Sequence, residues 1–188
     1  MTKYILHGGR TRNKTHDNEE FFLEMVKDIP LNATILSVYF ARDKELWSKL
    51  SEQDKINFSH ASPQNSFNFI QADDDLHIFV EQIKKADLIY LWGGHTKMLM
   101  SVLSKVKYLK ELFKDKVVAG SSAGVNVLSK FYYSTRSEGI FDGLGILPIK
   151  AICHYKMEYL DKLEELKEYG EELEVYAIPE EKFFVIED

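Results

Sequence analysis

Short apolar runs alternate along the chain with longer stretches in which apolar residues recur at helical spacing. The runs are almost uninterrupted, which is typical of strands buried on both faces of a parallel sheet. Turn residues close several of them, for example Gly8-Gly9 and Gly93-Gly94. The runs predict strands at residues 4–6, 34–40, 67–70, 88–92, 117–119, 149–155, 173–178 and 183–186.

The stretches between these runs predict helices. An acidic run at residues 73–75 precedes one of them, and carboxylates stabilise the N-terminal end of a helix. Alternating strands and helices predict an α/β fold, with a doubly wound, mostly parallel sheet and helices on both faces. Without a repeat or a linker composition, residues 1–188 are expected to form one domain. Helices are expected at residues 17–27, 46–56, 76–83, 96–113, 125–132 and 157–169, and irregular segments at 57–66 and 133–148.

Composition narrows the class of protein. A net charge of −6 without a basic stripe argues against a nucleic-acid partner. The single cysteine, Cys153, excludes a disulfide within the chain and favours a reducing compartment. The apolar start is too short for a signal peptide, and no run approaches the roughly 20 residues of a membrane span. A cytoplasmic protein without a membrane partner is expected.

Residues 120–124 carry the clearest chemical signal. They read Gly-Ser-Ser-Ala-Gly, between an expected strand and an expected helix. A serine hydroxyl is a weak nucleophile and must be held where a base can reach it. Strand, tight Gly-x-Ser-x-Gly turn and helix together predict a nucleophile elbow with Ser122 at its tip. The alternative is a plain strand-to-helix turn with a serine cap.

A base for Ser122 is expected at the carboxyl ends of the strands, where such sheets bind ligands. His154 lies in the strand expected at residues 149–155, and histidine is the usual general base near neutral pH. A structural role for His154 is the alternative. His7 and His95 also follow strands, but no metal-ligand spacing links the three, so no metal is expected. Cys153 points to the opposite face of its strand from His154 and is expected in the core.

Four segments, in chain order, are similar to segments of one known family. Residues 120–127 resemble a Gly-x-Ser-Ala-Gly-Ala-Asn segment, and residues 88–96 resemble a strand followed by Gly-Gly-Gly-Asn-Thr. Residues 152–155 resemble a Pro-His-Tyr segment, and residues 177–188 a closing acidic strand. The family is peptidase E, which contains α-aspartyl dipeptidases and, more distantly, cyanophycinases. The resemblance covers nearly the whole chain.

The resemblance implies a fold like that of class I glutamine amidotransferases, with serine in place of their cysteine. It implies a Ser–His–Glu triad of Ser122, His154 and Glu180, with Glu181 as the alternate acid because the register is uncertain by one residue. It also implies an oxyanion hole made by the amides of Gly94 and Ala123, and no cofactor.

Departures from the family pattern bear on specificity. Trp92 stands where the family has the first of three glycines, His95 replaces the asparagine and Cys153 the proline. Aspartyl dipeptidases of the family have an arginine that follows the histidine in the chain, and this arginine binds the aspartate side chain of the substrate. Here the last arginine is Arg136, so weak preference for an N-terminal aspartate is predicted unless Arg136 reaches the site. Candidate substrate contacts are His95, Arg136, Tyr155 and Lys156.

The sequence therefore predicts a serine hydrolase that cleaves amide bonds of short peptides through an acyl-enzyme. Two alternatives remain. An esterase of the α/β-hydrolase type would use Ser122, Asp142 and His154, with the acid before the histidine instead of after it. A binding protein of the same fold would have lost turnover. Neither the substrate nor the assembly state follows from the sequence, which leaves a homo-oligomer open.

Overall fold

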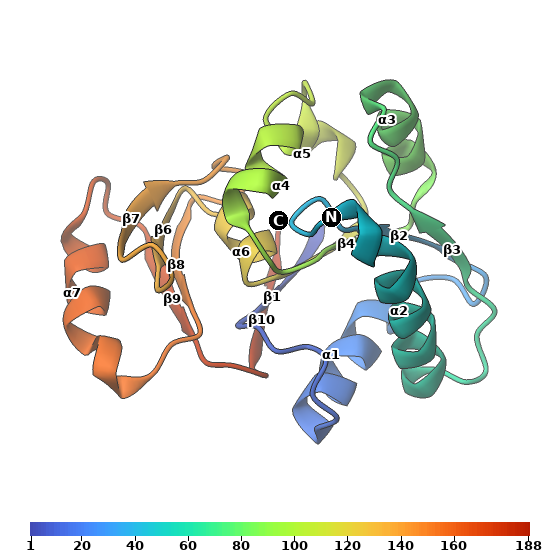
Figure 1. Ribbon diagram of the computed structural model, residues 1–188, viewed down its shortest axis with the longest axis horizontal. Helices are drawn as coiled ribbons and strands as arrows, with labels where there is room; N and C mark the ends of the chain where they lie inside the picture. The colour runs from blue at the N-terminus through green and yellow to red at the C-terminus, as the bar shows by residue number, and fades with distance from the viewer.

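A six-stranded sheet forms the centre of the molecule in the computed structural model, which describes residues 1–188 (Figure 1). Five strands are parallel, and β10 pairs antiparallel with β1 at one edge. In spatial order the strands are β10 (Phe183–Glu187), β1 (Lys3–His7), β5 (Val117–Ser121), β4 (Leu88–Leu91), β2 (Thr34–Val38) and β3 (Asn68–Gln71).

Helices cover both faces of this sheet. Two long helices contact each other on one face, namely α1 (His16–Val26) and α2 (Trp47–Ala61), the latter preceded by the short 3₁₀ turn Lys44–Leu46. The opposite face carries α3 (Leu76–Lys85), α4 (Thr96–Leu103), α5 (Leu109–Leu112) and α6 (Ala123–Leu128). The central strands β1, β4 and β5 are buried along their whole length, because both faces are covered.

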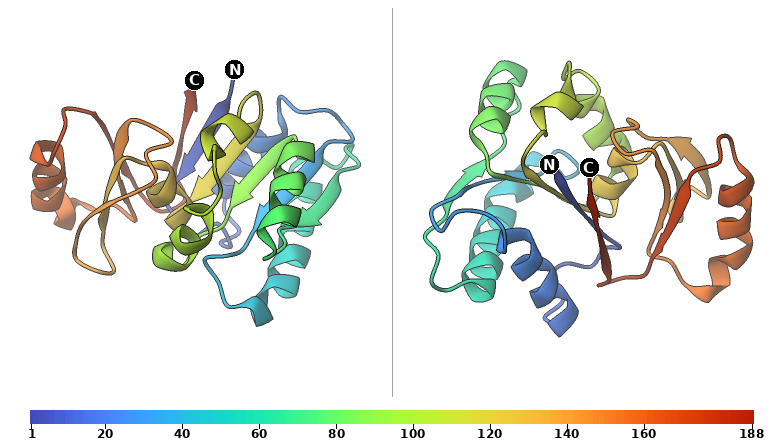
Figure 2. Two further views of the ribbon diagram at one scale, coloured as in Figure 1. Left: turned by 90° about the horizontal axis from the view of Figure 1, so that it is seen from above. Right: turned by 180° about the vertical axis from the view of Figure 1, so that it is seen from behind.

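A second, four-stranded sheet lies at one end of the molecule and is covered on its outer side by α7 (Figure 2). It has its own small apolar cluster of Phe131, Tyr133, Ile152 and Leu166. Its strands, in spatial order, are β7 (Gly139–Asp142), β6 (Phe131–Ser134), β8 (Ile149–Cys153) and β9 (Glu174–Ile178); the 3₁₀ turn Met157–Tyr159 leads into α7 (Leu160–Glu168).

The α/β class and the mostly parallel sheet are confirmed, and the differences are local. The segment expected to be irregular at residues 133–148 contains most of the β6–β7 hairpin, so there are two sheets instead of one. Helix α2 continues to Ala61, into the expected loop at residues 57–66. The single helix expected at residues 96–113 is divided into α4 and α5 by turns at residues 104–108, and Tyr108, just before α5, has a left-handed backbone with φ of 57°. No helix is long and apolar enough to cross a membrane.

The topology brings several chain turns to one edge of the large sheet. Strands β1, β4 and β5 are parallel and adjacent, so the segments that follow them, Gly8-Gly9, Gly93-Gly94 and Ser122, lie at their common carboxyl edge. The second sheet adds His154, which directly follows β8. A cleft between the two sheets therefore collects residues from these four segments, from Arg42 and from residues 132–141.

Candidate active site

Ser122 stands at a sharp turn between β5 and α6. Its backbone has φ of 49° and ψ of −99°, a conformation that a non-glycine residue rarely adopts and that costs energy. The Ser122 N–H donates to the carbonyl of His7 at 2.9 Å, which holds the turn against β1. Glycine is required at position 124, since a Cβ there would lie 2.3 Å from the Leu91 carbonyl oxygen. A strand, a tight turn with a strained serine and a helix have the geometry expected of a nucleophile elbow.

The imidazole of His154 contacts the serine hydroxyl. Its Nε2 lies 2.9 Å from Ser122 Oγ. His154 has a left-handed backbone, with φ of 55°, and its N–H donates to the Gly8 carbonyl at 3.0 Å. The ring packs on Gly9, where a Cβ would come within 2.2 Å of Cε1. The missing side chain at position 9 thus makes room for the histidine.

Glu180 lies on the other side of the histidine ring. Its Oε1 is 3.0 Å from His154 Nδ1, and its Oε2 is 2.7 Å from Arg10 Nε. Burial alone would raise the pKa of Glu180, but the hydrogen bond from His154 and the Arg10 guanidinium outweigh it, so its pKa is lowered. A carboxylate that accepts from Nδ1–H leaves Nε2 free to accept the serine proton.

The other two candidate acids lie elsewhere. Glu181 has a left-handed backbone with φ of 67°, and its carboxylate accepts a hydrogen bond from Asn13. Asp142 is exposed in β7, where it is paired with Phe131, and makes no hydrogen bond to His154. The structure therefore brings neither Glu181 nor Asp142 to the histidine, and the arrangement needed for an α/β-hydrolase esterase is not present.

A buried histidine organises the turn next to the His154 ring. His7 accepts a hydrogen bond from the Gly9 N–H at Nδ1, at 3.0 Å, so its Nε2–H donates to Asn18 Oδ1 at 2.9 Å. The Asn18 amide donates in turn to the carbonyls of Arg10 and Asn13. Burial lowers the pKa of His7 to about 4, and the nearby His154 acts in the same direction. A neutral His7 thus holds the segment that carries Arg10.

Two backbone amides are left without an acceptor at the positions expected for the oxyanion hole. The Gly94 N–H has no acceptor within the protein, and Ala123 is the first residue of α6, where the helix provides no partner for its N–H. Gly93 packs close to the elbow, since a Cβ there would lie 3.5 Å from Ser122 Cβ. Both glycines line the cleft beside the serine.

The cleft has a volume of about 550 Å³ and a cationic lining. The chain has four arginines, and every one of them lines it, together with Lys97. No aspartate or glutamate side chain belongs to the lining. The pKa of Arg42 is lowered by burial and by the guanidiniums of Arg12 and Arg136, so these cations face one another without a carboxylate between them. A protein of net charge −6 thus has a positively charged site.

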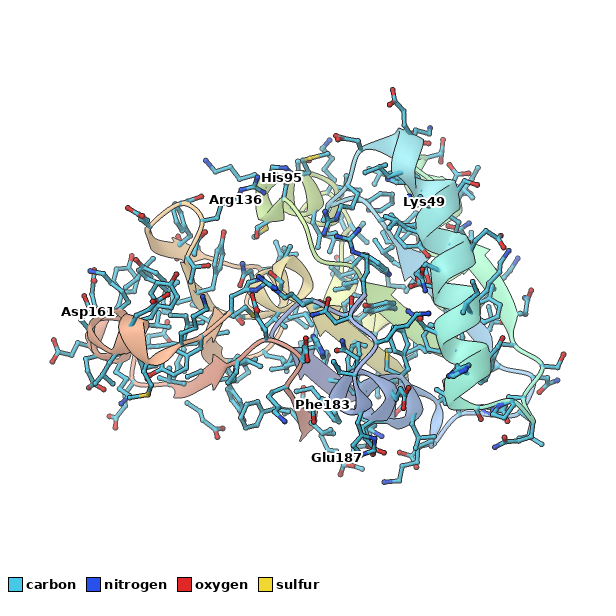
Figure 3. All side chains as sticks on the ribbon, turned by 60° about the horizontal axis from the view of Figure 1, so that its bottom comes forward. Lys49, His95, Arg136, Asp161, Phe183 and Glu187 are labelled. Atoms are coloured by element: carbon cyan, nitrogen blue, oxygen red, sulfur yellow. The ribbon has the colours of Figure 1, made fainter.

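The candidate substrate contacts divide into two pairs. His95 and Arg136 both line the cleft and contact each other, with Arg136 Nη1 3.3 Å from His95 Nδ1; Figure 3 labels this pair. Tyr155 and Lys156 lie outside it. Tyr155 packs in the second sheet's apolar cluster, and the exposed Lys156 faces Glu158, because the chain turns away from the cleft after His154.

Sequence reasoning missed Arg10, Arg12 and Arg42, because it sought a cation after His154. The positions of the arginines in the sequence could have indicated this, because the chain has only four arginines and three of them lie in segments that follow expected strands. Cys153, by contrast, is buried as expected, and burial raises its pKa to about 12, which rules out a reactive thiolate near neutral pH. No group of three or more histidine, cysteine or acidic side chains is arranged to hold a metal ion.

The comparison with protein families identifies the class of protein to which this chain belongs. The model of peptidase family S51 matches residues 5–188, almost the entire chain. The chain therefore belongs to peptidase family S51 and is a serine peptidase of the peptidase E type. No functionally curated protein matches the sequence.

Solved structures agree on the fold. A peptidase from an acI-B1 actinobacterium superposes with a TM-score of 0.72 at 19% identity, covering 99% of this chain and 83% of that one. A protein from Listeria monocytogenes EGD-e assigned to peptidase E superposes with a TM-score of 0.67 at 20% identity, covering 99% of this chain and 94% of that one. At such identities the likeness supports the fold alone.

Proposed function

We propose that this peptidase cleaves amide bonds of short peptides through a triad of Ser122, His154 and Glu180. The observation that carries the proposal is an unbroken chain of contacts: Ser122 Oγ to His154 Nε2 at 2.9 Å, and His154 Nδ1 to Glu180 Oε1 at 3.0 Å. Both distances lie within hydrogen-bond reach without any bound substrate.

The reaction follows from these contacts. Ser122 Oγ attacks the substrate carbonyl carbon while His154 Nε2 takes the hydroxyl proton. The tetrahedral intermediate collapses, His154 gives the proton to the leaving amine, and an acyl-enzyme on Ser122 remains. Water then attacks the ester with His154 again as base, which releases the acid and restores the serine. Glu180 fixes the tautomer of the ring and stabilises the imidazolium.

The oxyanion that forms on the carbonyl oxygen needs donors fixed in advance. The amides of Gly94 and Ala123 are suited to this, because neither is committed to an acceptor in the free protein. Donors aimed at the developing charge, in a site with little water, account for a large part of such catalysis.

Short peptides suit the size and charge of the cleft. A volume of about 550 Å³ lies within the range of small-ligand pockets, roughly 300–1,000 Å³. The unpaired guanidiniums of Arg12, Arg42 and Arg136 are suited to carboxylates, which they bind in a bidentate manner. In a dipeptide the free carboxylate is close to the scissile bond, so substrates of this length place it within the cationic cleft.

The test is a comparison of two adjacent serines. Ser122→Ala should abolish both peptide hydrolysis and labelling by a fluorophosphonate, because only an activated serine attacks the phosphorus. Ser121→Ala should retain most activity, since Ser121 is buried in β5 and has no hydrogen bond to His154. Turnover that survives Ser122→Ala in a homogeneous, folded preparation would contradict the proposal.

A further inference from the structure

A carboxylate outside the cleft is linked to the proposed oxyanion turn. Asp54 lies in α2 and is 1% exposed. It accepts hydrogen bonds from Ser37 Oγ at 2.8 Å, from Tyr39 Oη, and from Trp92 Nε1 at 2.9 Å to each of its oxygens. All three donors are neutral, so no cation offsets the cost of burying this acid.

The three donors come from two neighbouring strands. Ser37 belongs to β2 and Tyr39 directly follows it, whereas Trp92 directly follows β4. These strands pair in parallel, so their ends lie together at the edge of the sheet where the cleft is found. Asp54 therefore ties α2 to both strand ends through side chains alone.

Trp92 is the donor nearest to the chemistry. It is followed by Gly93 and Gly94, whose backbone lies beside the elbow. On the far side of this turn, the Gly93 carbonyl accepts from Arg42 Nε at 2.6 Å, and the His95 N–H donates to the Ala41 carbonyl at 2.8 Å. Residues 41–42 thus hold the Gly93–Gly94 turn from one side. On the other side, the indole bonded to Asp54 fixes the residue that precedes the turn.

The departure from the family pattern explains why an acceptor is needed. Trp92 stands at a position where the resemblance leads us to expect glycine, and its indole is 2% exposed. A buried indole N–H requires a hydrogen-bond acceptor. Asp54 supplies this acceptor with both of its oxygens, each 2.9 Å from the indole nitrogen.

We propose that Asp54 is a positioning residue that acts through Trp92 to hold the Gly93–Gly94 turn in the geometry required of an oxyanion donor. Asp54 does not line the cleft and touches no substrate. The inference rests on the proposed function, because that function requires the Gly94 amide as a donor.

The experiment measures the second-order rate constant for labelling by a fluorophosphonate. In labelling, Ser122 Oγ forms a bond to phosphorus, fluoride leaves, His154 takes the proton, and the phosphoryl oxygen occupies the oxyanion site. Asp54→Leu keeps the branched shape of the side chain, with larger terminal groups, but removes the acceptor. Its labelling rate constant should fall at least about tenfold, since loss of one oxyanion donor costs about 10²–10³-fold. Asp54→Asn retains an acceptor for the indole and should stay within about threefold of wild type.

A matched control separates positioning from general destabilisation. Ser37→Ala removes one donor to Asp54 but leaves the Trp92 contact, and should label at the wild-type rate. If Asp54→Leu does not fold, Trp92→Phe removes the indole donor together with part of the ring and should show the same fall. In a Trp47→Phe background Trp92 is the sole tryptophan, so its emission should shift in Asp54→Leu but not in Ser37→Ala.

The outcomes distinguish the two proposals. A wild-type protein that labels no faster than Ser122→Ala would overturn the proposed function and this inference with it. A wild-type protein that labels, alongside folded Asp54→Leu and Trp92→Phe variants that label equally fast, would overturn the inference alone. Equal losses in Asp54→Leu and Ser37→Ala would likewise overturn it, because a merely structural role predicts that result.

Discussion

Lowering the pH should destabilise this protein through one buried histidine. His7 is fully buried, and its pKa falls from 6.5 to about 4 because burial disfavours the charged ring. The carboxylates of Glu181 and Asp17 and the amide of Asn18 oppose that fall, and His154 adds to it. As the pH falls, His7 therefore becomes protonated near pH 6.5 in the unfolded chain but only near pH 4 in the folded protein.

The sign and size of the effect follow from linkage. Stability falls with decreasing pH wherever the unfolded state binds more protons, so the contribution of His7 is complete above pH 6.5 and is lost as the pH falls toward 4. The interval from 6.5 to about 4, at about 1.4 kcal/mol for each pH unit, corresponds to roughly 3 kcal/mol. That is a large share of the roughly 5–15 kcal/mol by which domains are stable.

The assay is urea unfolding at closely spaced pH values between 7.5 and 4, for wild type and His7→Gln. A glutamine side chain offers an acceptor for the Gly9 N–H and a donor for Asn18, but it does not titrate. Because other groups titrate equally in both proteins, the difference between the two stabilities isolates His7. That difference should change by about 3 kcal/mol across the range; a difference that stays constant would refute the reasoning.

Two further predictions concern the site itself. Glu180→Gln should lower kcat by about 10³–10⁴-fold, because an amide can donate to Nδ1 and favour the unproductive tautomer of the histidine. Glu181→Gln should keep a kcat near that of wild type. Steady-state kinetics on a dipeptide compares the two variants, and equal losses of kcat would argue against Glu180 as the acid. Arg136→Ala should raise KM for Asp-Leu more than for Asn-Leu, since it removes a cation from the cleft. If the variant still prefers Asp-Leu as strongly as wild type does, Arg136 is not the residue that recognises the aspartate.

Local patterns in the sequence were sufficient for the parts of the site that are contiguous in the chain. The elbow at Ser122 is encoded by a strand, five small residues and a helix, so it was predicted with its geometry. The choice between Glu180 and Glu181 was not, because it depends on backbone conformation: the left-handed φ of Glu181 turns its side chain toward Asn13. Such single-residue conformations leave no periodic signal.

Features assembled from distant segments escaped prediction for a different reason. Arg12, Arg42 and Arg136 reach one cleft only because the sheet order brings their loops together, and no local pattern encodes that order. Asp54 lies in a charged helical stretch that suggests a solvated face, yet it is fully buried. The β6–β7 hairpin was missed because its aromatic residues continue the apolar spacing of the preceding helix.

The pairing of β1 with β10 has a consequence for the order of events during synthesis. Strands β1 and β10 are hydrogen-bonded neighbours that lie side by side in both views of Figure 2. The turn between β9 and β10 carries Glu180, which contacts the His154 ring that packs on Gly9. The elbow and His154 are synthesised before Glu180. In the proposed triad, the histidine therefore gains its acid only after the β9–β10 turn has been made and β10 has paired with β1.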